Sequence, residues 1–225
     1  MNFYFLVEGR RTEKKVYREW TKHVFQGMGA VDRVEDFSGN NFFVLSANGY
    51  PLSSDTYQKT VQDVHDSGVD HLFVCVDADE ESLSERYEKI SDELKKLQCP
   101  CSFSVIVADC CMETWFLGNQ KMMSRQPAKG SKFFQMYQHY NVLTQDPEGM
   151  PKPSVFVESR AEYHVNYFQA MCQEKGVTYT KKYPGSVLES TYLAALVKRC
   201  QETNHLSSFQ ALMTAWQSLG GKFPV

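Results

Sequence analysis

The sequence predicts an α/β fold with a mainly parallel, Rossmann-like sheet and helices on both faces. Four short apolar runs, at residues 3–7, 41–46, 71–76 and 102–108, have the length and composition of buried strands. A segment with helical spacing of apolar residues follows each of the first three runs. Strands that alternate with helices in this way form parallel sheets through right-handed crossovers.

Each predicted helix has its own start signal and apolar stripe. Thr12 is a candidate N-cap followed by Glu13 in the first turn, and Ser54 or Asp55 can cap the second helix, which ends at Ser67-Gly68. In the third helix the apolar stripe comprises Leu83, Tyr87, Ile90, Leu94 and Leu97.

After Asp109 the chain changes character. A short helix is expected at residues 112–117, ending at Gly118, and residues 119–153 carry few periodic signals. Helices are expected at residues 160–174 and 188–200, with a last one capped by Ser207 or Ser208. We therefore expect an α/β domain at residues 1–118 and a mostly helical extension at 119–225, packed on it without a low-complexity linker.

Composition indicates a folded protein outside the membrane. The chain is 42% hydrophobic and 13% aromatic, and no apolar run approaches the roughly 20 residues of a membrane helix. The first residues lack the basic region of a signal peptide and reach Glu8 early. We expect a cytoplasmic protein.

The seven cysteines do not suggest a disulfide framework, because their number is odd and the expected compartment is reducing. Zinc is the sharper alternative, but Cys99-Pro-Cys101 and Cys110-Cys111 lack the Cys-x-x-Cys spacing. The histidines at positions 71, 164 and 205 lack metal-pair spacing, and we interpret them as local hydrogen-bonding residues.

Charge is distributed unevenly along the chain. Residues 1–118 hold 12 basic and 20 acidic residues, a net −8, whereas residues 119–225 hold 12 and 7, a net +5. A metal centre beside a basic surface suits phosphodiester chemistry. Ordinary solvated surfaces that happen to differ are the alternative.

Three acids stand where apolar strands run out into loops. Glu8 follows the first strand, and Asp77 and Asp79 follow the third. Ligands of open α/β sheets bind outside the carboxyl ends of the strands, and carboxylates gathered there suit Mg²⁺ or Mn²⁺. Asp77 and Asp79 share a side if the strand continues through Ala78. Alternatively, the aspartates are turn residues and Glu8 is a helix-start acid.

This pattern resembles the Toprim domain of topoisomerases, DnaG-type primases, OLD-family nucleases and RloB-like proteins. The residues that carry the resemblance are Val7-Glu8-Gly9, Thr12-Glu13 and Asp77-Ala-Asp79, and it covers roughly residues 1–118. The resemblance implies a general acid/base role for Glu8 and metal binding by Asp77 and Asp79.

Further acids are less determined. The segment Glu113-Thr-Trp115-Phe-Leu117 resembles an acidic-aromatic motif of RloB-like proteins, which makes Glu113 a candidate metal ligand. A buried Glu113 needs a metal or an arginine as partner, and a surface position is the alternative. Glu80 reads as a helix-start acid, and Glu81 is open between that reading and the metal site.

Two basic clusters are candidate phosphate contacts. Arg10, Arg11 and Lys14 follow Glu8 near a helix start and can bind the substrate backbone. The Lys182-Tyr-Pro-Gly stretch resembles one in RloB-like proteins, so Lys182 is expected at the scissile phosphate and Lys181 beside the substrate. Solvated lysines and arginines are the alternative for both clusters.

A topoisomerase needs a further domain with a nucleophilic tyrosine, and a primase needs a polymerising body; the chain has room for neither. The resemblance therefore implies a metal-dependent nuclease that cleaves RNA, tRNA among the candidates, or DNA. It also implies a bacterial anti-phage or toxin-like effector with an ATPase partner. The alternatives are a non-catalytic, Mg²⁺-binding effector or binding subunit of an ATPase, and a phosphatase-like small-molecule enzyme.

Overall fold

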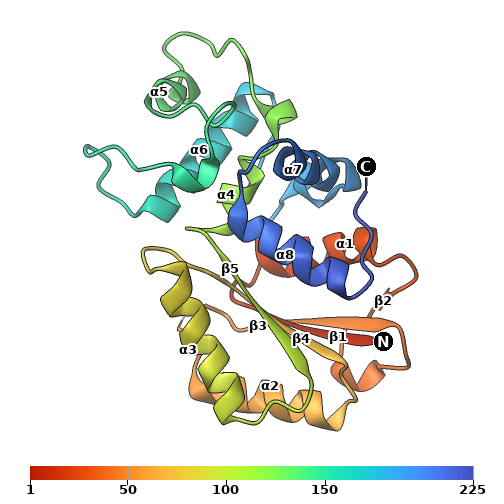
Figure 1. Cartoon of the computed structure of the whole chain (residues 1–225). Helices are drawn as coiled ribbons and strands as arrows, with labels where there is room; N and C mark the ends of the chain where they lie inside the picture. Colours follow the sequence, from red (N-terminus) through yellow and green to blue (C-terminus); the bar gives the residue numbers. More distant parts are fainter. Residues whose placement is uncertain (50, 225) are drawn as a thin grey trace.

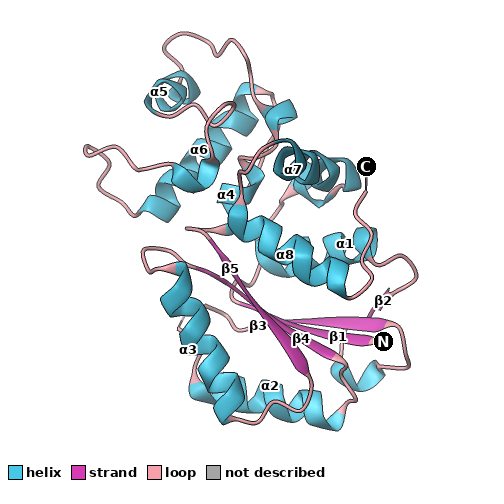
Figure 2. Ribbon diagram, in the orientation of Figure 1, coloured by secondary structure: helices cyan, strands magenta, loops and turns pink. Residues whose placement is uncertain are grey.

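The chain folds around a five-stranded, all-parallel sheet (Figures 1 and 2). The computed structural model describes residues 1–49 and 51–224. The sheet order is β2-β3-β1-β4-β5. The strands are β1 (Asn2–Val7), β2 (Gly29–Ala30), β3 (Asn41–Ser46), β4 (His71–Asp77) and β5 (Ser102–Ala108). The predicted parallel α/β fold is confirmed, and the two-residue β2 is an addition at the edge.

Both faces of the sheet are buried, which explains why the central strands are apolar throughout. Phe3 and Phe5 point into one core and Tyr4 and Leu6 into the other, and all four side chains are fully buried. Helices α2 (Ser54–Asp66) and α3 (Leu83–Lys96) cover one face (Figure 1).

Helices α1 (Thr12–Val24) and α8 (Ser207–Ser218) cover the other face of the sheet (Figure 1). Beyond them lie the remaining helices and three 3₁₀ segments. These are α4 (Met112–Phe116), α5 (Lys132–His139), α6 (Arg160–Glu174), α7 (Ser190–Glu202), η2 (Gln120–Met122), η3 (Pro147–Gly149) and η4 (Gly185–Leu188). The other 3₁₀ segment, η1 (Val34–Asp36), lies on the α2 face of the sheet, where Val34 belongs to the core beneath α2. The mainly helical second half is thus observed as predicted.

The core is continuous across residue 118. Trp216 of α8 lies with its ring centroid 6.3 Å from that of Phe5 on β1. The ring centroid of Trp20 on α1 lies 5.8 Å from that of Phe209 on α8, and Trp20 donates its indole N–H to the carbonyl of Val187. These aromatic contacts fix the helical half against the sheet.

Several predicted helix caps were wrong. Thr12 is the first residue of α1, and its hydroxyl donates to the carbonyl of Lys181 at 3.0 Å. Ser53, one residue before the predicted position, caps α2 by accepting from the N–H of Thr56. Leu206, at φ 59°, precedes α8. Capping depends on local backbone angles that side-chain type alone does not determine.

Ser208 serves tertiary packing instead of capping. Its hydroxyl accepts from Trp115 Nε1 at 2.7 Å and from the N–H of Asp109 at 3.0 Å, and it contacts the buried Glu148. These contacts tie the start of α8 to the region between β5 and α4.

The stripe predicted for α3 was wrong at one position. Tyr87 is 51% exposed, whereas Arg86 is 2% exposed and donates to the carbonyl of Ala78 at 3.1 Å. Glu80 lies before α3, which begins at Leu83, and accepts from the N–H of Arg160 at the start of α6. Glu80 therefore supports a different helix from the one predicted.

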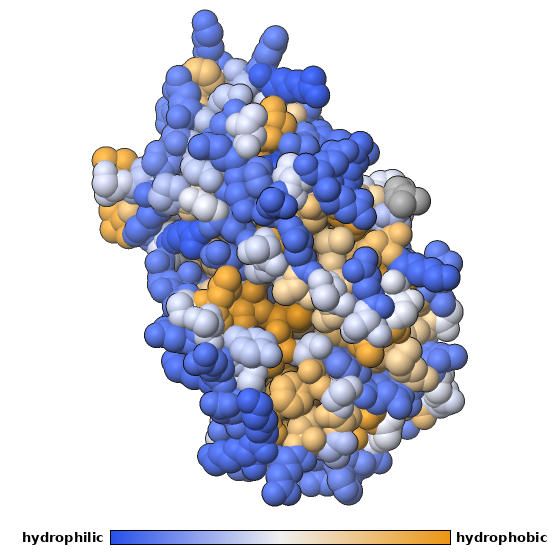
Figure 3. Space-filling view, viewed as in Figure 1, coloured by the Kyte–Doolittle hydropathy of each residue, from blue (hydrophilic) through white to orange (hydrophobic). Residues whose placement is uncertain are grey.

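Figure 3 shows a hydrophobic surface patch over β5, which is an edge strand of the sheet. A second hydrophobic patch protrudes in Figure 3, at the place where Figure 1 draws the loop before α6. In this loop Val155 and Val157 are 88% and 91% exposed. Within residues 1–49 and 51–224, no helix combines the length and apolarity needed to cross a membrane.

Candidate functional site

Glu8 leaves the sheet between two neighbouring strands. Val7 pairs with Cys75 of β4, and the N–H of Glu8 continues this ladder by donating to the carbonyl of Cys75 at 3.1 Å. The carbonyl of Glu8 accepts from Gly49 at 3.0 Å. Its carboxylate Oε2 accepts from the backbone N–H of Asp77 at 3.2 Å. The strand ends therefore bring Glu8 to Asp77, as predicted.

Asp77 and Asp79 do not share a strand. β4 ends at Asp77, and Asp79 has a left-handed φ of 52°. The N–H of Ala78 donates to Ala108 and that of Asp79 to Cys110, at 2.9 and 2.8 Å. The chain turns toward the end of β5, so the expected continuation of the strand through Ala78 does not occur. Both aspartates are partly buried.

Glu13 is a site residue that the sequence did not single out as a candidate. It lies in the first turn of α1, and its carboxyl packs against the backbone of Gly9. A Cβ added at Gly9 would lie only 2.1 Å from Glu13 Cδ. Gly9 is therefore required for this close approach. The sequence showed Glu13 only as a helix-start acid, because the contact depends on how α1 leaves β1.

Glu113 is buried, with 2% of its surface exposed. Its Oε1 accepts from the hydroxyl of Tyr179 at 2.7 Å, and Lys181 Nζ lies 4.0 Å away. The surface alternative for Glu113 is therefore wrong. Its observed partners are a phenol and a lysine, where an arginine or a metal was expected.

The carboxyl groups gathered at this edge of the sheet have electrostatics that favour protonation or a bound cation. Burial raises the pKa of Glu8 to about 7; the hydrogen bond from the N–H of Asp77 opposes this and the charge of Asp79 adds to it. Burial likewise raises the pKa of Asp77 well above its ordinary range, and the charges of Glu13, Glu8, Glu113 and Asp79 add to the shift. Ionised carboxylates here repel one another in a poorly hydrated place.

The pKa values of two more acids, Glu13 and Asp79, are also raised. Burial raises the pKa of Glu13, and Glu113 adds to it. Burial raises the pKa of Asp79, although Arg86 and Lys181 pull it down. The pKa of Lys181 is itself raised, chiefly by Glu113. We call Glu8, Glu13, Asp77, Asp79 and Glu113 the acidic group; Lys181 is the lysine in contact with it.

Lys181, rather than Lys182, is the lysine that contacts the acidic group. The ammonium of Lys182 lies 5.1 Å from the ring centroid of Tyr183, and its carbonyl accepts from Lys15 at 2.6 Å. The turn is closed by a bridge between Thr180 and Tyr183. This turn directs the ammonium of Lys181, rather than that of Lys182, to Glu113.

The other basic candidates lie around the start of α1. Arg10 is exposed and donates to Asn48 at 2.7 Å. Arg11 is exposed at the N-cap position, and Lys14 is partly buried in the first turn. Glu81 lies 3.1 Å from Arg86 and 3.5 Å from Lys89, so it forms ion pairs outside the acidic group.

The donors of the acidic group are all carboxylate oxygens, the ligands that Mg²⁺ and Mn²⁺ prefer. Among the residues that the structure describes, only Cys110, Cys111 and His164 form a group of three ligand atoms that all lie within 4.8 Å of one another. Glu8, Asp77 and Asp79 are thus not drawn into a compact three-ligand sphere. They still fit Mg²⁺, which takes one or two carboxylates and keeps several waters.

The structure therefore defines an α/β protein with an acidic group at the carboxyl edge of a parallel sheet. Comparison of the chain with protein-family models, curated proteins and solved structures finds no match.

Proposed function

We propose that this protein is a Toprim-type, Mg²⁺- or Mn²⁺-dependent nuclease that hydrolyses phosphodiester bonds in RNA, tRNA included, or in DNA. One observation carries the proposal: the carboxylates of Glu8, Glu13, Asp79 and Glu113 lie close enough to Asp77 for their charges to raise its pKa, and Lys181 lies beside Glu113. Ligands of parallel α/β sheets bind at this edge. A divalent cation relieves the repulsion that raises the pKa values of these acids.

Within this site, Asp77 and Asp79 are the proposed ligands of the cation, with Glu8, Glu13 and Glu113 close enough to contribute through their charge. The bound cation supplies Lewis-acid stabilisation of the phosphate and activates water. Glu8 has a pKa of about 7, which suits a group that gives and takes protons near neutral pH.

Lys181 is the proposed contact for a phosphate oxygen. Its side chain is 55% exposed, so the ammonium can turn from Glu113 to a substrate without burying a new charge. Lys182, whose ammonium lies over Tyr183, is in this proposal a flanking residue. Arg10, Arg11 and Lys14 supply further positive charge beside Glu8.

The Toprim resemblance is supported by how its motif residues are arranged. The matching glutamate and aspartates lie at the ends of adjacent parallel strands, and Glu8 hydrogen-bonds the backbone of Asp77. The helix that begins at Thr12-Glu13 returns a fourth acid to the same place. This arrangement is what an acid/base glutamate beside a metal-binding aspartate pair requires.

Basic residues of the second half gather around one cavity of about 750 Å³. Its lining includes Lys121, Arg125, Lys175, Lys198 and Arg199. Arg199 is 1% exposed, and its Nη1 has no hydrogen-bond partner among the described residues. A polyanion neutralises such a cavity, which supports a nucleic-acid substrate over a small phosphate ester.

As the resemblance implies, we further propose that the protein acts in an anti-phage or toxin-like system with an ATPase partner. The second candidate function is a non-catalytic, Mg²⁺-binding effector subunit of that ATPase. It is favoured by the spread of the acidic group, in which no three carboxylates among the described residues form a compact ligand sphere.

Incubation of the pure chain with labelled tRNA, mRNA and plasmid DNA, with Mg²⁺, Mn²⁺ or EDTA, separates the two functions. If the protein is a nuclease, we expect cleavage of at least one of these nucleic acids that EDTA abolishes. We also expect that Lys181→Met slows cleavage more than its matched control Lys182→Met. Metal binding without cleavage of any substrate, alone and with the ATPase partner, favours the effector subunit.

A further inference from the structure

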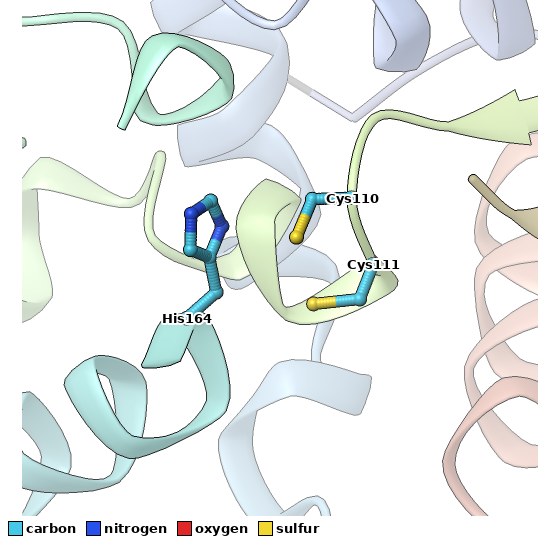
Figure 4. A group of neighbouring side chains, drawn as sticks. All are labelled: Cys110, Cys111 and His164. Carbon is cyan, nitrogen blue, oxygen red and sulfur yellow. The ribbon is translucent and has the colours of Figure 1, made fainter. Parts of the chain in front are cut away.

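A second cluster of potential ligands lies away from the carboxylates (Figure 4). Cys110 and Cys111 occupy the turn between β5 and α4, and His164 lies on α6. Two sulfurs and one imidazole nitrogen all lie within 4.8 Å of one another. Each side chain is at most 2% exposed. Figure 4 shows both sulfurs and one ring nitrogen directed into the same space.

The backbone explains how adjacent cysteines reach the same side. Consecutive residues of a strand point to opposite faces. Cys110 instead has a left-handed φ of 66°, which is rare for a residue with a side chain. Its carbonyl accepts from Asp79 at 2.8 Å, and the N–H of Cys111 donates to Asp109 at 3.0 Å. These bonds hold a turn that brings both thiols together.

His164 is oriented as metal-binding histidines usually are. Its Nε2 lies 2.9 Å from the carbonyl of Met150, which can only accept, so Nε2 carries the proton. Nδ1 is therefore unprotonated, and its lone pair accepts from the hydroxyl of Thr114 at 2.8 Å. A histidine that donates one N–H to a backbone carbonyl has its other nitrogen fixed for a ligand.

The donor set selects a soft ion. Two thiolates and an imidazole suit Zn²⁺, whereas Mg²⁺ prefers oxygen. Zn–S bonds of about 2.3 Å and Zn–N bonds of about 2.1 Å place tetrahedral ligands roughly 3.5–3.8 Å apart. The three atoms therefore need to approach one another by about 1.3 Å at most. The two thiolate charges neutralise the ion, which lowers the cost of burying it.

We propose that Cys110, Cys111 and His164 bind one Zn²⁺ ion, with the Thr114 hydroxyl or a water as fourth ligand. Thr114 already contacts both His164 and Cys111 Sγ. The ion joins the turn before α4 to α6, and thus links the two halves of the chain. It is a structural site, and its presence does not depend on whether the protein is a nuclease.

The test uses the full chain, purified under reducing conditions. We expect about one zinc per chain by elemental analysis, and a thiolate-to-cobalt charge-transfer band when Co²⁺ replaces it. The variant Cys110→Ser/Cys111→Ser should lose both signals. Its matched control, Cys99→Ser/Cys101→Ser, removes the same number of thiols from a partly exposed pair and should keep them.

His164→Gln separates ligation from folding and should weaken Co²⁺ affinity at least tenfold. The proposal is overturned if the reduced wild-type chain gives no charge-transfer band with Co²⁺, a result that needs no variant. It is also overturned if both double variants retain equal zinc, or if Cys110 and Cys111 form a disulfide and bind no metal after reduction.

Discussion

Glu8→Gln should stabilise the metal-free protein at alkaline pH while abolishing its proposed activity. The pKa of Glu8 is raised from 4.5 to about 7, mainly by burial. Each pKa unit corresponds to about 1.4 kcal/mol, so ionising Glu8 in the folded state costs about 3 kcal/mol before screening. Because the side chain is partly exposed, we expect about 1–2 kcal/mol.

The sign of the pH dependence follows from the raised pKa. The folded state binds the proton of Glu8 more tightly than the unfolded chain does, so this stabilisation is complete below pH 4.5. It is lost as the pH rises to about 7. Glutamine stays neutral and keeps an acceptor for the N–H of Asp77. Stability should therefore differ little at pH 4 and clearly at pH 8.

Thermal unfolding followed by circular dichroism in Mg²⁺-free buffer measures the difference. For a chain of this length, 1–2 kcal/mol corresponds to a gain of about 2–8 °C in Tm at pH 8. Glu88→Gln, an exposed acid on α3, is the control and should leave Tm unchanged. A Glu8→Gln variant that is destabilised at pH 8, or equally shifted at both pH values, refutes the reasoning.

Three further predictions concern the surroundings of the site. Gly9→Ala places a Cβ 2.1 Å from Glu13 Cδ, so the Glu13 carboxyl must move. The Mn²⁺ affinity measured by electron paramagnetic resonance should therefore fall, and an unchanged affinity would show that Glu13 does not contribute to the cation site. Tyr179→Phe deletes the 2.7 Å hydrogen bond to buried Glu113 and should lower the free energy of unfolding, measured by urea denaturation, by about 1–3 kcal/mol. A loss below about 0.5 kcal/mol, roughly a third of a typical buried hydrogen bond, would show that Lys181 or water is a sufficient partner for Glu113. Arg125→Ala/Lys198→Ala at the basic cavity should weaken RNA binding and flatten its salt dependence, by a slope of about 1 per lost phosphate contact, and an unchanged slope would place the nucleic acid elsewhere.

The strands and most helices were predictable because their signals are local. A strand buried on both faces is a continuous apolar run, and β1, β3, β4 and β5 each show one. The meeting of Glu8 and Asp77 was also predictable, since parallel neighbouring strands end at the same edge of a sheet.

The missed features depend on tertiary geometry. Glu13 joins the site only because Gly9 admits its carboxyl, and the choice of Lys181 over Lys182 is made by a turn. The cysteine pair was set aside for its spacing, yet the left-handed Cys110 turns both sulfurs toward His164 on another helix. No local periodicity reports contacts of this kind.

The single-turnover rate at which wild type and Asp77→Asn cleave labelled RNA and DNA in Mg²⁺ decides whether the acidic group is a nuclease site. Asp77 is the acid on which the charges of the other four act. We expect a rate reduced about a hundredfold or more in Asp77→Asn, because several kcal/mol of transition-state stabilisation are lost, and an unchanged rate in Glu88→Gln. Equal cleavage by wild type and Asp77→Asn would contradict this expectation, because the activity would then come from another site.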